Sequence, residues 1–303
     1  MPEIVVIGSY VVSLTVRVPR KPVVGEALIG DLFDMGPGGK GTNQAIAAAR
    51  LGARVDLVAC VGDDPFADMA VRLFESEGIE TGHIHRICDV NTGVGMVTLL
   101  PSGDNMIVGH LGTNMLMQPH HVEAIEQRIA RCDVLMAQLE APVETVVHAL
   151  KLGRKHRALT ILNPAPGQPL DPSILANVDL LTPNESETRI LLGLAPDDPT
   201  PTLDLTGSLL ELGVETVVVT RGEKGAVIVT AGGTEEVPAV PVHALDVTGA
   251  GDSFNAALAV ALGAGMDLHS AVEQANRAGA YTTTHLGVID GLPTSAELET
   301  FPG

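Results

Sequence analysis

The 303-residue chain has very few aromatic side chains: it lacks tryptophan, and its two tyrosines and five phenylalanines make up 2% of the sequence. Its interior must therefore be built from aliphatic side chains, and the apolar share of 45% is large enough for that. This composition excludes a disordered or fibrous chain. We expect a single domain over residues 1–303, because this length is close to the upper size of one hydrophobic core, roughly 250–300 residues.

Basic residues are also scarce. The chain has 18 lysines and arginines against 37 aspartates and glutamates, which gives a formal net charge of -19. Such a surface repels the phosphates of nucleic acids and anionic lipids, so we expect neither nucleic acid nor a membrane as a partner. An anionic substrate would need local positive features that overcome this field.

Cysteine and long apolar runs are rare as well. Cys60, Cys88 and Cys132 lie far apart without a Cys-x-x-Cys pair, which excludes a disulfide framework or a zinc ribbon and fits a reducing compartment. The N-terminus has no basic segment before its first apolar run, and the longest apolar stretch, 254–262, is too short to span a bilayer. These features predict a soluble protein of the cytoplasm.

Short apolar runs alternate with helical patterns along most of the chain. Residues 4–7 are all apolar, as expected of a strand that is buried on both faces. A helical pattern that Asp64 caps and Pro65 begins is the clearest of the helices. The alternation predicts a doubly wound α/β fold with binding sites at the carboxyl ends of its strands. Further strands are expected at 55–61, 134–139, 159–162, 178–182 and 214–220.

Two stretches have the alternation of strands that are buried on one face only. Residues 11–18 alternate between apolar and polar, and 92–110 has a hairpin pattern with its turn at 101–104. Such strands do not fit inside the central parallel sheet. We expect them to form a small sheet that projects over the strand ends as a lid, made of about 10–36 and 91–112 and inserted in the α/β core.

A glycine-rich segment, 36–43, precedes an alanine-rich helical pattern. Its glycines would let the backbone come close to a ligand, and Lys40 and Asn43 would lie at the start of the helix. A phosphate-binding P-loop is excluded, because that motif needs Ser or Thr directly after the lysine and Gly41 follows here. A ligand site and a plain tight turn both stay open for this segment.

A second glycine-rich segment, 246–252, leads into the apolar helical pattern 253–262. Small residues at a helix start expose backbone N–H groups at the positive end of the helix dipole, which makes an anion site. Asp252 lies in the same turn, so its carboxylate could remove a hydroxyl proton while the N–H groups neutralise a migrating phosphoryl group. The plainer alternative is an acidic residue that caps a glycine-rich turn.

These two segments and four others, in this order, resemble the ribokinase-like carbohydrate kinases nearly from end to end. Residues 38–45 read Gly-Gly-Lys-Gly-x-Asn-Gln-Ala, and 246–252 read Asp-x-x-Gly-Ala-Gly-Asp. The resemblance implies an α/β/α sandwich with a mostly parallel central sheet and a small β-sheet lid. The other matching segments are 138–140, 163–166, 182–185 and 220–222.

The resemblance also implies the roles of individual residues. Asp252 corresponds to the catalytic base of the family, and the backbone of Gly249, Ala250 and Gly251 corresponds to its anion hole. The implied sugar-binding residues are Val11, Ser13, Gly38, Gly39, Lys40, Asn43, Glu140 and Asp252.

Val11 and Ser13 depart from the family's pattern, because ribose-specific members have Asn-x-Asp at these two positions. A buried sugar hydroxyl that faces Val11 would lack a partner, at a cost of about 1–3 kcal/mol. A sugar that lacks a hydroxyl, or an acceptor with an apolar group at that edge, therefore fits this chain better than ribose.

ATP as co-substrate, Mg²⁺ and a monovalent cation, usually K⁺, are further implications of the resemblance. Glu187 matches the acidic residue that organises Mg²⁺ through water, and the metal neutralises the β- and γ-phosphate oxygens together. The implied nucleotide-binding residues are Asn184, Thr220, Arg221, Gly222, Glu223, Lys224, Gly225, Gly251 and Asn276. The monovalent cation is expected at Asp246, Thr248, Thr282, His285 and Gly287.

The expected activity is ATP-dependent phosphoryl transfer to a primary hydroxyl of a small sugar. A nucleoside kinase of the same family and a catalytically silent sugar-binding regulator are the alternatives, although a regulator would be expected to have lost Asp252 or its glycines. A dinucleotide-binding dehydrogenase is disfavoured, since Gly-x-Gly-x-x-Gly does not follow the first strand. An exposed apolar edge of the lid strands predicts a homodimer.

Histidines gather in two places outside these motifs. His83, His85 and Cys88 match no standard metal-site spacing, so we expect exposed loop residues there. His120 and His121 begin a predicted helix and are expected to be solvated.

Overall fold

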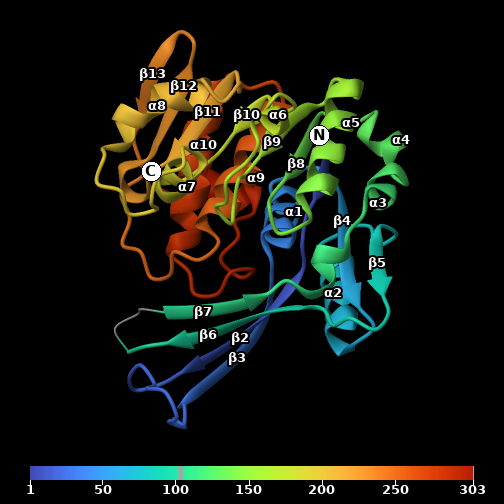
Figure 1. The fold of residues 1–303 in the computed structure, drawn as a ribbon, viewed down its shortest axis with the longest axis vertical. Coiled ribbons are helices and arrows are strands. Elements are labelled where there is room, and N and C mark those ends of the chain that lie inside the picture. Colours follow the sequence, from blue (N-terminus) through green and yellow to red (C-terminus); the bar gives the residue numbers. More distant parts are fainter. Residues whose placement is uncertain (102–104, 303) are drawn as a thin grey trace.

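The computed structural model of the chain describes residues 1–101 and 105–302, so most of the predicted turn at 101–104 lies outside the described residues. The described residues form two sheets, one of nine strands and one of four (Figure 1). The larger sheet has helices on both faces, and the smaller one extends away from it. This arrangement confirms the predicted α/β fold with a small accessory sheet.

The nine-stranded sheet has the order β13-β12-β11-β10-β9-β8-β1-β4-β5. Counted from the β5 edge, its first seven strands are parallel: β5, β4, β1, β8, β9, β10 and β11. At the opposite edge, β12 and β13 add an antiparallel hairpin. Neither this hairpin nor β5 was predicted. The strands are β1 (Glu3–Ile7), β4 (Arg54–Gly62), β5 (Ile84–Ile87), β8 (Val134–Ala137), β9 (Leu159–Leu162), β10 (Leu180–Leu181), β11 (Thr216–Thr220), β12 (Ala226–Thr230) and β13 (Gly233–Val237).

Helices cover both faces of this sheet. The α-helices are α1 (Lys40–Arg50), α2 (Pro65–Ser76), α3 (Pro119–Glu123), α4 (Glu126–Ile129), α5 (Val143–His156), α6 (Pro172–Leu175), α7 (Glu185–Leu191), α8 (Thr202–Leu210), α9 (Ala250–Gly263), α10 (Leu268–Thr283) and α11 (Ser295–Thr300). Two 3₁₀ helices, η1 (Gly112–Leu116) and η2 (Gly222–Lys224), complete the set. In the described part of the chain, no helix combines the length and apolarity needed to cross a bilayer.

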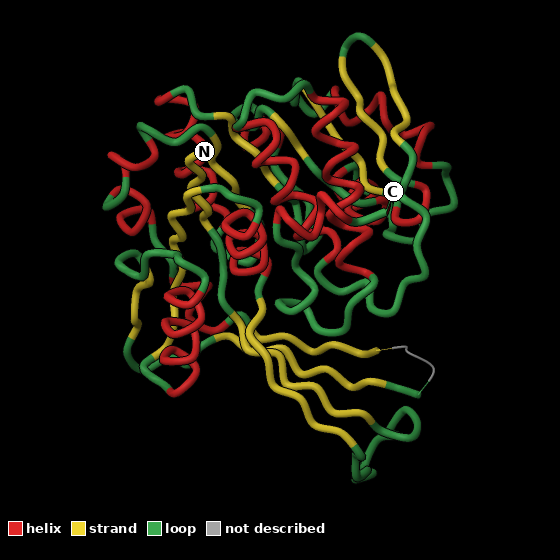
Figure 2. The backbone as a smooth tube through the Cα atoms, turned by 180° about the vertical axis from the view of Figure 1, so that it is seen from behind, coloured by secondary structure: helices red, strands yellow, loops and turns green. Residues whose placement is uncertain are grey.

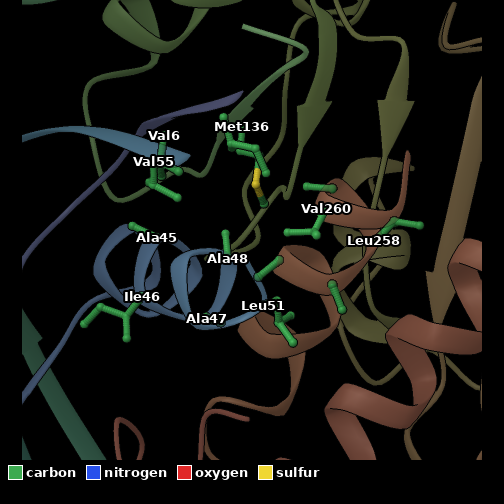
Figure 3. Close-up of a cluster of buried hydrophobic side chains, with 14 of the residues drawn as sticks. Val6, Ala45, Ile46, Ala47, Ala48, Leu51, Val55, Met136, Leu258 and Val260 are labelled. Carbon is green, nitrogen blue, oxygen red and sulfur yellow. The ribbon is translucent and has the colours of Figure 1, made fainter. Parts of the chain in front are cut away.

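Alternate residues of β1 enter two separate hydrophobic clusters. Ile4 and Val6 pack on the face covered by α1 and α9, whereas Val5 and Ile7 face α5. Alanines of α1 and α9 let the two helices pack closely, and Figure 3 shows Ala48 on the side of α1 that faces Val260, whereas Ala45 lies below Val6 and Val55. Small aliphatic side chains thus fill a core that has few aromatic rings.

The start of α2 confirms the predicted cap. Asp64 Oδ1 accepts hydrogen bonds from the backbone N–H groups of Phe66 and Ala67, each at 3.1 Å, and Pro65 is the first helical residue. A side-chain acceptor and a proline in the first turn both satisfy the unpaired end of a helix.

The small sheet consists of β3 (Leu32–Gly38), β2 (Val11–Arg17), β6 (Gly93–Leu99) and β7 (Asn105–His110), in this order. Figure 2 shows it as an arm that leaves the body of the molecule. Strands β2, β6 and β7 were predicted, but β3 was not, because its Gly-Pro-Gly end looked like a turn. Pro37 is tolerated there since β3 is an edge strand, and the turn itself is confined to Gly39, whose φ of 99° suits glycine.

The two faces of the small sheet differ sharply. Cross-strand neighbours flank Val11 with Gly38 and Gly93, and Ser13 with Gly36 and Gly95, so the base of that face carries few side chains. The other face is apolar but largely uncovered in the single chain, which corrects the expectation that one face is buried. Among the described residues of this face in the four strands, only Val12 at its base is buried, and the exposed ones include Val16, Phe33, Met35, Met96 and Val108.

His83, His85 and His121 are less exposed than predicted, whereas His120 and Cys88 are exposed as predicted. His121 is 8% exposed, its Nδ1 accepts from Gln118 N at 3.0 Å, and its ring centroid lies 4.4 Å from that of His85 and 4.0 Å from that of His120. His85 lies in β5 rather than in a loop, and burial together with the neighbouring histidines lowers its pKa to about 4. Among the described residues, no three His, Cys, Asp or Glu side chains converge as metal ligands.

Candidate active site

The start of α9 faces open space. Gly249 precedes the helix with φ at 82°, and no side chain caps the helix in the described structure. A Cβ atom at Gly251 would have no neighbour within 4 Å. The unpaired N–H groups of the first turn are therefore accessible, and the helix dipole gives this end a positive partial charge.

Asp252 lies in the first turn of α9 and is 6% exposed. Its Oδ2 accepts a hydrogen bond of 2.8 Å from Asn43 Nδ2, and its Oδ1 accepts one of 3.0 Å from Gln44 Nε2. The structure thus brings the two predicted glycine-rich segments together across more than 200 residues of sequence. Gln44 was missed as a functional candidate, although it directly follows Asn43 in the motif.

Glu140 contacts the backbone of Lys40 at the start of α1. Glu140 Oε2 accepts from the backbone N–H of Lys40 at 2.8 Å and from Ser9 Oγ at 2.5 Å. Ser9, which was not predicted as a site residue, therefore holds the carboxylate in place. Gly39 also lies close to this point, because a Cβ atom there would be 3.0 Å from Ser9 O and 3.1 Å from Val11 N.

The half-buried side chain of Lys40 lies in the field of three acidic groups. Burial by itself lowers the pKa of the ammonium. The negative charges of Asp252, Glu140 and Glu187 outweigh that effect and raise the pKa above its ordinary value. Lys40 therefore stays protonated and is available to neutralise or donate to a bound ligand.

Glu187 faces the site from the start of α7. Its Oε2 accepts from Asn184 N and its backbone N–H donates to Asn184 Oδ1, both at 2.8 Å, which forms a capping box. Burial raises the pKa of Glu187, Asn184 N and Lys40 lower it, and Asp252 raises it further, with a net increase. One ammonium among three carboxylates leaves an excess of negative charge that suits a divalent cation.

A cleft of about 480 Å³ lies at the carboxyl ends of β10 and β11. Its lining includes four predicted nucleotide-binding residues, Asn184, Thr220, Arg221 and Gly222. Arg221 is already paired, because its guanidinium donates to Glu236 Oε2 at 2.5 Å. Its positive charge is thus partly neutralised within the protein, whereas the neighbouring Glu223 and Lys224 are exposed.

Two other predicted nucleotide-binding residues, Gly225 and Asn276, contact the end of β13. A Cβ atom at Gly225, whose φ is 82°, would lie 2.2 Å from Val237 O. Asn276 Nδ2 donates to Val237 O at 3.2 Å and to Pro238 O at 3.0 Å. Only the amide oxygen of Asn276 is thus left for a ligand.

The residues predicted to bind a monovalent cation gather beside α10. Asp246 accepts from Thr248 N at 2.9 Å through Oδ1 and from Gly287 N at 3.4 Å through Oδ2. His285 N donates to Thr282 O at 3.1 Å where α10 ends. Carboxylate and carbonyl oxygens are the donors that hard cations prefer, so the set fits such an ion.

Comparison with known proteins gives concordant matches. The profile of the pfkB family carbohydrate kinases matches residues 1–295. The chain is 38% identical to a ribokinase of Bacillus subtilis over 300 residues, which are 99% of each chain. It is 36% identical to a deoxyribokinase of Salmonella typhi over 293 residues, 96% of each chain.

Solved structures match equally well along the chain. A ribokinase of Thermotoga maritima has a TM-score of 0.90 at 30% identity, and the match covers 99% of this chain and 98% of that chain. The Arabidopsis thaliana ribokinase, which was solved in complex with ribose and ATP, has a TM-score of 0.88 at 26% identity and covers 99% of both chains.

Proposed function

This chain belongs to the pfkB family of carbohydrate kinases and is an ATP-dependent sugar kinase, and we propose that Asp252 is its catalytic base. The observation that carries this proposal is the position of the Asp252 carboxylate. It lies in the first, uncapped turn of α9, beside Asn43 and in the electrostatic field of Lys40. A base, an anion site and sugar-binding donors thus converge at one point.

In the proposed reaction, the primary hydroxyl of the sugar loses its proton to Asp252. Its oxygen forms a bond to the γ-phosphorus of ATP, and the bond from that phosphorus to the bridging oxygen breaks to release ADP. The backbone N–H groups at Gly249, Ala250 and Gly251 stabilise the charge on the migrating group, for which that of Ala250 would give up its 3.3 Å hydrogen bond to Val247 O. Lys40, Asn43 and Glu140 orient the sugar.

Mg²⁺ and a monovalent cation complete the proposed site. Bound Mg²⁺ would neutralise the β- and γ-phosphate oxygens. Glu187 would hold the metal through water, since its Oε2 already accepts a hydrogen bond from Asn184 N. The Asp246 carboxylate and nearby carbonyl oxygens would hold K⁺. The nucleotide would lie along the cleft that Asn184 and Thr220 line.

We propose a pentose that lacks a hydroxyl as the preferred acceptor. Val11 lies between Gly38 and Gly93 on the small sheet, so its side chain can provide only an apolar contact where ribose-specific relatives have Asn. Gly39 places Val11 N next to the segment that carries Lys40. The similarity to a deoxyribokinase supports this assignment, although a ribokinase is similarly close.

An acceptor screen tests this proposal. We would measure kcat/KM with ATP, Mg²⁺ and K⁺ for 2-deoxyribose, ribose, other pentoses and a panel of nucleosides. The deoxypentose should be preferred over ribose by about 10-fold, as expected when a ribose hydroxyl is left without a partner. An equal or greater efficiency with ribose would contradict the assignment, and a preference for nucleosides would favour a nucleoside kinase. Sugar binding without any transfer would favour a silent regulator.

The exposed apolar face of the small sheet is the proposed dimer contact. Phe33, Met96 and Val108 are 66%, 60% and 72% exposed, and a second copy would bury them by placing its own small sheet against them. A cytoplasmic location is proposed as well, supported by three cysteines that are all free thiols.

A further inference from the structure

We propose that Gln44 is a positioning residue that fixes the Asp252 carboxylate for proton transfer, as part of a closed ring of buried hydrogen bonds. This inference rests on the proposed role of Asp252 as the base. In this role Gln44 does not touch the sugar; it affects the reaction by positioning the carboxylate of Asp252.

The amide of Gln44 is fully occupied within the protein. Gln44 Nε2 donates to Asp252 Oδ1 at 3.0 Å and to Asn163 Oδ1 at 3.2 Å, and its Oε1 accepts from Gln138 Nε2 at 2.6 Å. Because a carboxylate only accepts hydrogen bonds, Asp252 receives the Nε2 end of the Gln44 amide, and the Oε1 end faces the donor of Gln138. A reversed amide would place two acceptor oxygens against each other, so the donor is held toward the carboxylate.

The hydrogen bonds continue from Gln44 back to the residue before Asp252. Asn163 Nδ2 donates to Thr182 O at 3.0 Å, and Thr182 Oγ1 donates to Asn255 Oδ1 at 2.5 Å. Asn255 Nδ2 then donates to Gly251 O at 2.8 Å. The ring therefore joins the carboxylate of Asp252 to the backbone of its own helical turn.

The ring also ties the start of α9 to the rigid sheet. Gln138, Asn163 and Thr182 come just after β8, β9 and β10, at the carboxyl ends of three adjacent parallel strands. The side chains of the ring and the attached Gln138 are each at most 7% exposed: Gln44, Asn163, Thr182, Asn255, Asp252 and Gln138. Gln138 Oε1 has no partner in the described structure, whereas the amides of Gln44, Asn163 and Asn255 are bonded at both ends. Buried amides that are satisfied at both ends are restricted to one arrangement.

Asn43 and Gln44 differ in what they leave free. The Oδ1 atom of Asn43 is buried without a partner in the described structure, so this amide can still accept from a sugar hydroxyl. Gln44, by contrast, has both amide ends engaged. Asn43 is thus suited to contact the substrate, whereas Gln44 is suited to restrain the carboxylate, since proton transfer depends on a fixed donor–acceptor geometry.

The first test is Gln44→Met, which keeps the length of the side chain and removes its hydrogen bonds. We expect kcat to fall by about 10- to 100-fold, the effect of losing a hydrogen bond to a charged group, while KM for sugar and for ATP changes little. Thr145→Val, on α5, is the matched control. It deletes a buried hydrogen bond of 2.9 Å from Thr145 Oγ1 to Met117 O and should leave kcat unchanged. A loss that appears only in KM, or an unchanged kcat, would overturn the inference.

A double-mutant cycle separates positioning from a purely structural effect. If Gln44 acts through Asp252, Gln44→Met should lower kcat by less than about twofold in an Asp252→Asn background. The same fold loss in both backgrounds would show a structural effect and overturn the inference alone. Near-normal turnover of Asp252→Asn by itself would instead overturn the proposed base.

Gln138→Met provides the same test if Gln44→Met fails to fold. This variant leaves Gln44 in place and removes the donor to its Oε1, so the Gln44 amide is held only through its Nε2. Its loss in kcat should be smaller, about 3- to 10-fold, and should also disappear in the Asp252→Asn background. Persistence of the loss in that background would contradict the positioning role.

Discussion

Asp252 and Gln44 lie among side chains that are almost completely buried, whereas Phe33 and Val108 on the small sheet are 66% and 72% exposed. The polar groups around Asp252 are connected by side-chain hydrogen bonds that come from five different parts of the chain. At its base, the small-sheet face that carries Val11 and Ser13 is lined instead by glycines of β3 and β6.

This contrast suggests a division of tasks between the two regions. The carboxylate of the proposed base is fixed by buried contacts to the nine-stranded sheet, where a change of geometry is costly. The proposed selection of the acceptor and the proposed association with a second copy both involve the small sheet, where substitutions meet open space. The two regions should therefore respond differently to mutation, in kcat for the first and in acceptor preference or assembly for the second.

The largest effect is expected from Asp252→Asn, which removes the proposed base and keeps the size of the side chain. We expect kcat to fall by at least about 10²-fold, because general bases contribute about 10²- to 10⁴-fold. Asp267→Asn is the control: Asp267 caps α10 at the surface, and asparagine caps helices equally well. Steady-state kinetics with a saturating sugar would check both variants. A small effect of Asp252→Asn on kcat would contradict its role as the catalytic base.

Mutation of the proposed dimer contact should change assembly strongly. Met96→Glu places a charge on the apolar face of the small sheet, and burial of an unpaired charge should raise the dimer dissociation constant by at least about 100-fold. Sedimentation velocity would measure it. Val24→Glu, a fully exposed position outside the strands, is the control. A wild-type chain that is monomeric at all concentrations would contradict the proposed dimer.

A moderate effect is expected when polar groups are placed at the start of β2. The variant Val11→Asn with Ser13→Asp should shift the ratio of kcat/KM for ribose over 2-deoxyribose by about 10-fold in favour of ribose, since a hydroxyl gains partners. Thr15→Asn, on the same face and one pair further along β2, should leave the ratio unchanged. A ratio that is insensitive to Val11 and Ser13 would show that the small sheet does not select the acceptor.

The smallest expected effect concerns stability and pH. Burial raises the pKa of Glu187 in the folded protein above its unfolded value, so the folded state binds this proton more tightly. The contribution of Glu187 to stability is therefore greatest at low pH and declines as pH rises through the raised pKa. Glu187→Gln does not ionise and can keep the capping box, so its Tm relative to the wild type should rise between pH 4 and pH 8 without nucleotide or Mg²⁺.

Glu297 offers a control of opposite sign. It occupies the same position in the capping box of α11, where hydrogen bonds from Thr294 lower its pKa. A carboxylate whose pKa is lowered by folding stabilises the fold at pH values above its unfolded pKa. This contribution is lost as the pH falls through the lowered pKa. The Tm of Glu297→Gln relative to the wild type should therefore decrease between pH 4 and pH 8. Parallel pH dependence of the two variants would contradict the assigned environment of Glu187.

The sequence alone determined the class of fold and most of the candidate site. Apolar runs such as 4–7 indicate buried parallel strands because both faces must avoid water, and Asp64-Pro65 indicates a helix start through local hydrogen bonding. The two glycine-rich segments identified Asn43 and Asp252 as candidates. Local pattern was sufficient in these cases because the cause of each structure lies within a few neighbouring residues.

Only the tertiary structure decided what lies opposite each of these segments. It made a strand of β3, whose glycines look like a turn, because β2 supplies its hydrogen-bond partners. It also buried His121, left the apolar face of the small sheet exposed, and placed Gln44 against a carboxylate 208 residues away. Periodicity shows which side chains share a face, but the partner of that face comes from distant parts of the chain, and long-range packing alone brings them together.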